Sequence, residues 1–157
     1  MNEIKGLDEI MAKLKQLPDR VGRNAMKRAL RQGARPIRDA ARANAKQFDD
    51  PATSENISKN IVVQSANRRR EKQEGGPVMR VGVLGGARDM RAHGEFKGAG
   101  KSNPGGDTFY WRFLEFGTSR MAARPFMRPA MAAAGDKALE ATVAAMKAET
   151  DKELAKV

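Results

Sequence analysis

The most informative part of this chain is the sequence FYWRFLEFGT at residues 109–118, followed by AARPFMRPA at residues 122–130. The first segment holds five of the eight aromatic residues, and glycine and proline follow it closely. Such a stretch anchors a small core and turns the chain sharply. A carboxylate among rings, here Glu115, needs a cationic partner because an unpaired buried charge is expensive. The pattern predicts a structural corner in which Arg124 or Arg128 pairs with Glu115.

The residues near the N-terminus predict two helices. Apolar side chains recur at steps of three and four between residues 6 and 17, which is the spacing of a short amphipathic helix ended by Pro18. A second helix is expected from about residue 20 to 46, with Asp19 as its N-cap and a kink at Pro36, whose ring removes a helical hydrogen bond.

The second expected helix carries most of the net charge. The chain has a formal net charge of +11, and residues 20–46 contain nine basic side chains and one acidic side chain. Arginines at helical spacing can follow a nucleic-acid backbone without reading bases, whereas the alternative is a solvated face or one paired with acidic neighbours. The side chains expected to face nucleic acid or an acidic partner are Arg23, Lys27, Arg31, Arg35, Arg38 and Arg42.

The rest of the chain predicts a small sheet and a long helix. Short β-branched runs at residues 57–63 and 78–84 favour strands, and the charged residues 67–76 between them favour a loop. The glycine-rich residues 85–107 predict a flexible loop. The alanine-rich residues 125–155 predict a helix with a broad apolar face. Its members are Met131, Leu139, Val143, Met146 and Leu154.

The expected fold is therefore α+β, in a single domain over residues 1–157. It has two N-terminal helices, a small, mainly antiparallel sheet and a long C-terminal helix. The aromatic residues 109–116 suit a helical turn and a strand equally, so their conformation stays open at this point.

Catalytic patterns are missing from the sequence. Cysteine is absent, and His93 is the only histidine, in the glycine-rich stretch. The carboxylates of Asp49 and Asp50 precede a proline turn, and the glycines at residues 82–86 lack the lysine of a phosphate loop. We expect no enzymatic activity, no metal and no cofactor. Apolar runs fall short of the roughly 20 residues that cross a bilayer, so we expect a soluble chain made in the cytoplasm.

Residues 113–118 and 120–130 resemble the signature of a tail-component family of long-tailed bacteriophages. This is the neck or tail-completion group that includes tail-completion protein Z of phage lambda and its lambdoid relatives. The family hallmark is an aromatic–aliphatic–Glu-Phe-Gly-Thr turn followed by Pro-Phe-(Met or Leu)-Arg-Pro-Ala, and both halves are present. Residues 39–45 are also similar. Where members often carry a Gly-(Arg or Lys)-Leu turn before Ser-Ile, residues 53–61 (TSENISKNI) depart mildly.

This resemblance implies a structural protein of the virion tail or neck, without enzymatic activity. The family implies a homo-oligomeric ring, such as a hexamer, that completes the tail and joins it to the head around the DNA channel. Implied partners are the tail terminator and the head-closure or connector proteins, with packaged double-stranded DNA as a further candidate and no membrane. The alternative function is that of a sequence-independent, nucleoid-type DNA-binding protein. The residues assigned to the fold corner and subunit interface are Phe113, Glu115, Phe116, Gly117, Thr118, Arg124, Pro125, Phe126, Arg128 and Pro129.

Overall fold

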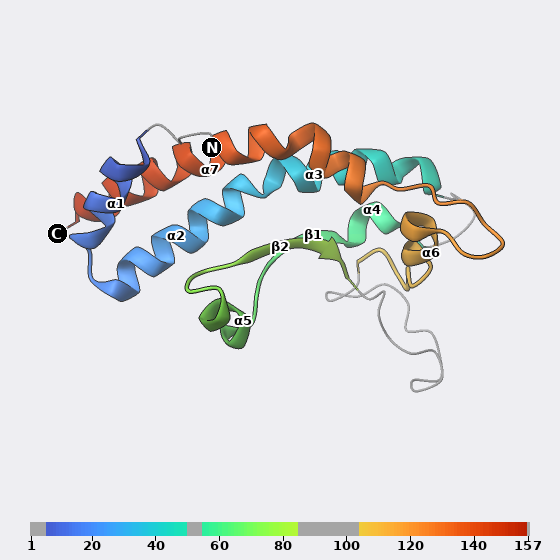
Figure 1. The fold of residues 1–157 in the computed structure, drawn as a ribbon, viewed down its shortest axis with the longest axis horizontal. Coiled ribbons are helices and arrows are strands. Elements are labelled where there is room, and N and C mark those ends of the chain that lie inside the picture. The colour runs from blue at the N-terminus through green and yellow to red at the C-terminus, as the bar shows by residue number, and fades with distance from the viewer. Residues whose placement is uncertain (1–5, 50–54, 85–103, 157) are drawn as a thin grey trace. The chain divides into compact units, whose positions relative to one another are not determined.

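The computed structural model describes residues 6–49, 55–84 and 104–156 (Figure 1). The chain divides into two compact units. Unit 1 comprises Met1–Arg35, Gln64–Arg80 and Asp136–Val157, and unit 2 comprises Pro36–Val63 and Val81–Gly135. The prediction of a flexible loop at residues 85–107 falls mostly outside the described residues and stays a prediction.

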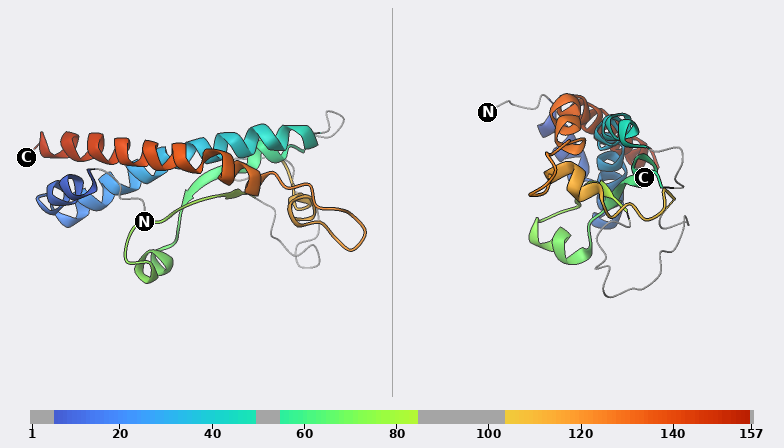
Figure 2. Two further views of the ribbon diagram at one scale, coloured as in Figure 1. Left: turned by 45° about the horizontal axis from the view of Figure 1, so that its top comes forward. Right: turned by 90° about the vertical axis from the view of Figure 1, so that its right-hand side faces the viewer.

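Unit 1 is built on helices α1 (Leu7–Lys15), α2 (Asp19–Gly33) and the C-terminal part of α7 (Met127–Leu154). These helices lie side by side in both sets of views (Figure 1, Figure 2). The predicted first helix is confirmed, and its stripe buries Ile10, with Leu17 buried just beyond its end. Asp19 is not the N-cap that the sequence predicted, because α2 begins at Asp19 and Pro18 holds the capping position without a side-chain bond.

The break in the predicted long helix falls next to Pro36. Helix α2 ends at Gly33, and α3 (Arg35–Ala45) follows, continued by the 3₁₀ turn η1 (Lys46–Phe48). Proline has no N–H to donate but fits the first turn of a helix, so Pro36 in the second position of α3 is tolerated there. The predicted single helix with a kink at Pro36 is therefore two helices, and the break between them lies just before this proline.

The sheet of the described residues consists of β1 (Ile61–Ser65) and β2 (Met79–Val83), which are antiparallel. Its ends are fixed by two backbone bonds of 2.8 Å, from Leu84 to Asn60 and from Ala66 to Val78. The second strand agrees with its prediction to within one residue at each end. The first prediction was wrong for residues 57–60, which form the short helix α4 (Ile57–Asn60).

The predicted loop at residues 67–76 was also partly wrong, because α5 (Arg68–Gln73) occupies most of it. Both missed helices begin after an asparagine. The Asn56 side chain accepts a hydrogen bond from the Lys59 N–H, and the Asn67 side chain accepts one from the Arg70 N–H. An asparagine cap of this kind satisfies a free helical donor and starts a helical turn even in a polar segment.

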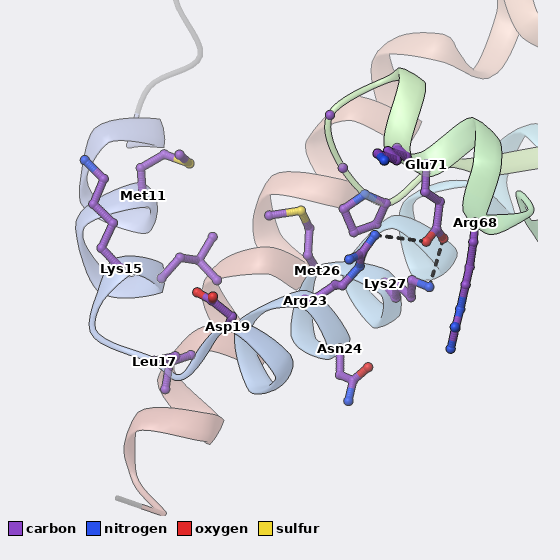
Figure 3. Close-up of a pocket in the computed structure, with 16 residues that line it drawn as sticks. Met11, Lys15, Leu17, Asp19, Arg23, Asn24, Met26, Lys27, Arg68 and Glu71 are labelled. Carbon is purple, nitrogen blue, oxygen red and sulfur yellow. Dashed lines mark hydrogen bonds and ion pairs between the residues drawn. The ribbon is translucent and has the colours of Figure 1, made fainter.

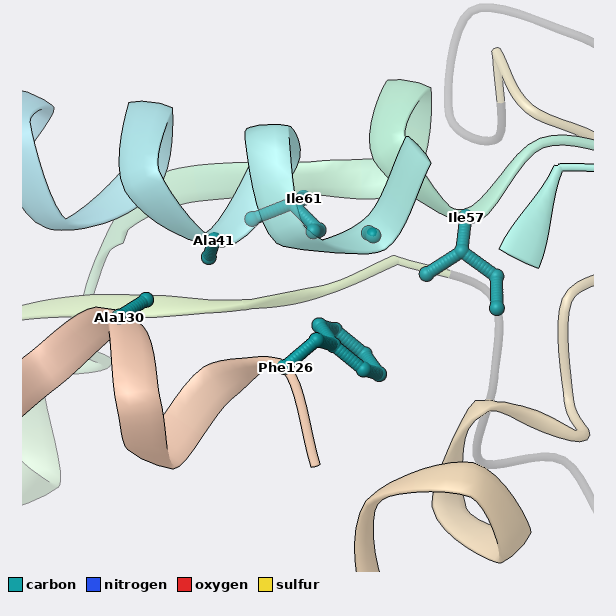
Figure 4. Packing of buried hydrophobic residues seen from close by; sticks show 6 residues of the cluster. Ala41, Ile57, Ile61, Phe126 and Ala130 are labelled. Carbon is teal, nitrogen blue, oxygen red and sulfur yellow. The ribbon is translucent and has the colours of Figure 1, made fainter. Parts of the chain in front are cut away.

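The core of unit 2 surrounds Phe126, whose side chain is fully buried (Figure 4). The ring of Phe48 lies 6.1 Å from the ring of Phe126 and packs against the same cluster. Small side chains on α3 and α7 allow close approach to these larger residues. The buried members of the cluster are Ala41, Ala45, Ile57, Ile61, Phe126 and Ala130.

Unit 1 is packed mainly through glycine and alanine. A β-carbon at Gly33 of α2 would collide with Thr142 of α7, at 2.8 Å from its Cβ and 2.9 Å from its Cα. Close contact of two helices requires such small residues at the crossing. The long C-terminal helix is confirmed as α7, but Met131 and Leu139 of its expected apolar face are exposed, whereas Ala138 and Ala145 are buried. The α+β fold class is confirmed.

Candidate functional site

Glu115 is the buried carboxylate near the end of α6 (Trp111–Phe116), with 2 % of its surface exposed. The aromatic segment is thus helical. The Glu115 carboxylate accepts hydrogen bonds from the consecutive backbone N–H groups of Phe126 (2.8 Å), Met127 (2.9 Å) and Arg128 (3.0 Å). Because α7 begins at Met127, this side chain caps the N-terminus of a helix that is distant in sequence.

The cap satisfies the donors at the start of α7. The first four N–H groups of a helix have no acceptor within it, and the positive end of the helix dipole favours a carboxylate. In α7 these four positions are residues 126–129. Glu115 accepts from the first three, and Pro129 has no N–H. We call residues 111–128, which include α6, the return of the chain and this first turn, the glutamate corner.

Arg128 is the arginine that contacts Glu115. Its Nε lies 3.4 Å from Glu115 Oε1, and its Nη2 donates to the Glu115 backbone carbonyl at 2.8 Å. The same guanidinium lies over the Phe116 ring, 5.8 Å from its centre. Arg124, the other arginine that the sequence offered, lies instead over the ring of Phe48 at 5.1 Å. Its backbone N–H donates to the Leu114 carbonyl at 2.7 Å, which ties the returning chain to α6.

Gly117 makes the return of the chain possible. Its φ is +75°, a conformation that residues with a β-carbon rarely adopt. A β-carbon there would also approach the Ala123 nitrogen and the Met121 oxygen to 2.9 Å each. Thr118 and Met121 then form an antiparallel bridge across the turn. The Gly-Thr pair of the sequence motif is therefore explained by backbone geometry.

The pKa of Glu115 lies below its ordinary value. Burial alone would raise this pKa, but the backbone N–H groups of Met127, Phe126 and Arg128, together with the Arg128 side chain, bind the charged form and outweigh burial. The carboxylate is therefore ionised at neutral pH and has its hydrogen-bond capacity occupied by helix donors. Such a group is suited to holding structure rather than to transferring protons.

The glutamate corner also presents aromatic side chains outward. Phe116 is 66 % exposed and Phe113 is 48 % exposed, whereas Phe126 is buried in the core of unit 2. Exposed aromatic rings beside arginines are enriched at protein interfaces. Of the predicted corner residues, Thr118, Arg124, Arg128 and Pro129 are exposed, and Gly117 and Pro125 are half-buried.

Two members of the predicted basic face are paired within the chain. Glu71 of α5 is buried, with 2 % exposed, and contacts Lys27 Nζ at 2.8 Å and Arg23 Nη2 at 3.2 Å. The Ser65 hydroxyl donates to the same carboxylate at 3.0 Å. The hydrogen bond from Lys27, assisted by Ser65, holds the pKa of Glu71 below its ordinary value despite burial. Arg23 and Lys27 therefore stabilise unit 1, whatever else they contact.

The other members differ in their surroundings. Arg38 pairs with its neighbour Asp39 at 2.7 Å, and Arg42 donates from Nε to the Ile61 carbonyl at 2.9 Å. Arg31 and Arg35 are exposed and contact no acidic side chain among the described residues. The structure thus divides the predicted face into internally paired and unpaired side chains.

The sequence did not indicate the role of Asn60, a fully buried residue of unit 2 whose side chain forms three hydrogen bonds. Its Nδ2 donates to the Gly106 carbonyl at 2.9 Å and to Thr108 Oγ1 at 2.8 Å, and its Oδ1 accepts from the Gly105 N–H at 2.7 Å. These bonds fasten residues 105–108 to the end of α4. Asn56, as a capping residue, could have indicated helix α4, but nothing in the sequence indicates that Asn60 is buried.

Replacing Asn60 by alanine is expected to lower the free energy of unfolding by about 2 kcal/mol, because buried donors and acceptors lose their partners. Urea unfolding followed by the fluorescence of Trp111, the single tryptophan, measures this change. The exposed Asn24, replaced by alanine, is the matched control and should change stability by less than about 0.5 kcal/mol. Equal effects of the two substitutions would contradict the assignment of Asn60 as the residue that holds residues 105–108 to α4.

Comparison with protein families gives a match over residues 8–117, to the model described as "Bacteriophage HK97-gp10, putative tail-component". The match covers α1 to α6 and ends at Gly117, within the glutamate corner. The chain belongs to this HK97-gp10-like family of bacteriophage tail components. Comparisons with curated proteins and with solved structures find no match.

None of the helices in the described part of the chain is both long and apolar enough to cross a membrane. Within the same residues, no cluster of three or more histidine, aspartate or glutamate side chains is placed to hold a metal ion.

Proposed function

We propose that this chain forms a homo-oligomeric ring at the head–tail junction of a long-tailed phage, where it completes the tail and joins it to the head. Membership of a phage tail-component family supports a structural role in the virion. The observation that carries the more specific proposal is the charge of α2 and α3. After the internal pairs are accounted for, Arg31 and Arg35 still lack an acidic partner among the described residues.

A ring multiplies this charge. Each subunit has a formal net charge of +11, so several subunits around one axis repel each other unless anions lie close by. Packaged double-stranded DNA passing through the ring, or an acidic neighbour in the neck, provides those anions. We propose that Arg31, Arg35 and Arg42 face this anion, whereas Arg23 and Lys27 serve first to hold Glu71.

The proposed role requires no catalysis. The glutamate corner holds a helix start with its carboxylate, and we propose that its exposed rings, Phe113 and Phe116, contact a neighbouring subunit or another neck protein. The tail terminator and the head-closure or connector proteins are the proposed partners. The chain would then reside in the neck or tail of the virion.

Disruption of the gene in its phage tests the proposal. We expect DNA-filled heads and separate tails in electron micrographs, and restored joining when the purified chain is added to the lysate. The Arg31→Glu/Arg35→Glu double variant should restore at most about a tenth of the infectious particles, because like charges would face the anion. The Arg69→Glu/Arg80→Glu variant, with the same change in charge at other exposed positions, should restore joining fully. Normal particles without the gene would end the proposal.

A salt titration distinguishes the alternative of a nucleoid-type DNA-binding protein. Non-specific DNA binding weakens steeply with salt in proportion to the number of phosphates contacted. We expect the isolated chain to bind duplex DNA weakly at physiological salt, because ring formation is needed to bring several basic faces together. Tight binding by isolated chains with a steep salt dependence would instead favour the nucleoid-type function.

A further inference from the structure

A groove of about 970 Å³ opens in unit 1 between α1, α2 and the segment from α5 to Pro77 (Figure 3). All of its lining residues belong to unit 1. The groove is separate from the glutamate corner, which lies in unit 2. Its volume is at the upper end of the range for sites that hold compact ligands.

One part of the groove wall is apolar. Met11, Leu14 and Leu17 come from α1 and the turn that follows it, Met26 comes from α2, and Pro77 comes from the opposite wall. Met11 is 43 % exposed, so its side chain is accessible to a partner in the groove. Methionine side chains adapt their shape and recur at surfaces that bind apolar side chains of partners.

The rest of the wall is basic. Five basic side chains and two acidic ones line the groove, and Glu71 is already paired with Arg23 and Lys27. The remaining basic residues, Lys15, Arg68 and Lys72, have no acidic partner in the described part of the chain. The groove therefore combines apolar contact surface with unpaired positive charge.

The buried Glu71 connects two walls of this groove. Its bonds to Arg23 and Lys27 join α2 to α5, which form two of its walls (Figure 3). A preformed binding surface reduces the ordering cost of association. The burial of Glu71 among lysine and arginine side chains is therefore explained by its role in joining α2 to α5.

From these contacts we infer that the groove binds an acidic amphipathic segment of another protein. Apolar side chains on one face of the segment contact Met11, Leu14 and Met26, and flanking carboxylates pair with Lys15, Arg68 and Lys72. Nucleic acid fits less well, because its phosphates make no favourable contact with the apolar side chains of the groove. The C-terminal part of a second copy of α7 fits less well, because Glu149, Asp151 and Glu153 there already pair with Arg28 and Lys13.

A synthetic peptide tests this inference on the full chain. The probe is an amphipathic helix with leucines at i, i+3, i+4 and i+7 and glutamates on both flanks. With methionine methyl groups labelled by ¹³C, the peptide should shift the NMR signals of Met11 and Met26. The signals of Met121 and Met131, which are exposed in unit 2, should stay in place and report that the fold is intact.

Charge variants complete the experiment. The Lys15→Glu/Lys72→Glu variant should bind the peptide at least about tenfold more weakly, and the Arg69→Glu/Lys152→Glu control should bind it as the unchanged chain does. A peptide with lysine in place of glutamate should not bind. Unmoved Met11 and Met26 signals, or equal binding of both peptides, would overturn the inference. Shifts of these two signals with protein concentration alone would also overturn it, in favour of a second copy as the occupant.

Discussion

Replacing Glu115 by alanine is expected to lower the free energy of unfolding by about 3–5 kcal/mol, since it leaves several backbone donors without their acceptor. Three backbone donors at the start of α7 lose their acceptor, and Arg128 loses its carboxylate. Trp111 lies on the same short helix and reports the loss directly in urea unfolding. The exposed Glu140 on α7, replaced by alanine, is the matched control and should have almost no effect.

The glutamine variant separates charge from shape. Glu115→Gln keeps a carbonyl acceptor of the same size but loses the charge, so we expect a smaller loss of about 1–2 kcal/mol. If the alanine and glutamine variants both lose less than about 1 kcal/mol, Glu115 is not the cap of α7.

The stability contributed by Glu115 depends on pH. Its folded-state pKa lies below its ordinary value of 4.5, so the ionised form favours folding. The contribution is therefore fully present above pH 4.5 and is lost as the pH falls through the lower folded-state pKa. The difference in stability between the unchanged chain and Glu115→Gln should shrink with acidification. A difference that is constant or grows with acidification would contradict this assignment.

Gly33→Ala is the second substitution with a large expected effect, a loss of about 3 kcal/mol from overpacking at the contact of α2 with α7. The added β-carbon would meet the Cβ and Cα of Thr142 at 2.8 and 2.9 Å, so backbone must move as well as side chain. Thermal unfolding followed by circular dichroism measures the change, because most of the described residues are helical.

Substitution of Gly135 by alanine is a control for which the opposite change in stability is expected. It lies within α7, and a β-carbon there would meet nothing within 4 Å. Gly135→Ala should therefore stabilise the chain by about 0.5–1 kcal/mol, because alanine is the better helix former. If alanine at Gly33 were also neutral or stabilising, the close approach of α2 and α7 would be wrong.

The long elements of the fold could be predicted from the sequence because local rules decide them. The apolar stripe of α1 and the missing N–H of Pro36 each act within a few residues. The short helices α4 and α5 were missed. An asparagine cap starts a helical turn in each of them, although β-branched residues in the first segment favour a strand and charged residues in the second favour a loop. The bounds of helix α7 were predicted correctly, but its buried face was not. The close contacts of this helix bury small alanine side chains rather than the large apolar ones.

The candidate site was predictable in part for a similar reason. A carboxylate within an aromatic segment indicated that Glu115 needs a partner, and one of the two arginines that the sequence offered does contact it. The three backbone donors could not be predicted, because they depend on where α7 begins in space relative to α6. Glu71 gave no signal at all, since its neighbours in sequence are arginine, lysine and glutamine, typical of a solvated segment.

The most direct test of the account is a cryo-electron microscopy reconstruction of the intact virion, with this chain located in the density. The account predicts a ring of this chain at the head–tail junction, with Arg31 and Arg35 directed toward the DNA or toward an acidic neighbour. Density for the chain elsewhere in the particle, or a ring whose Arg31 and Arg35 point into open solvent, would contradict it.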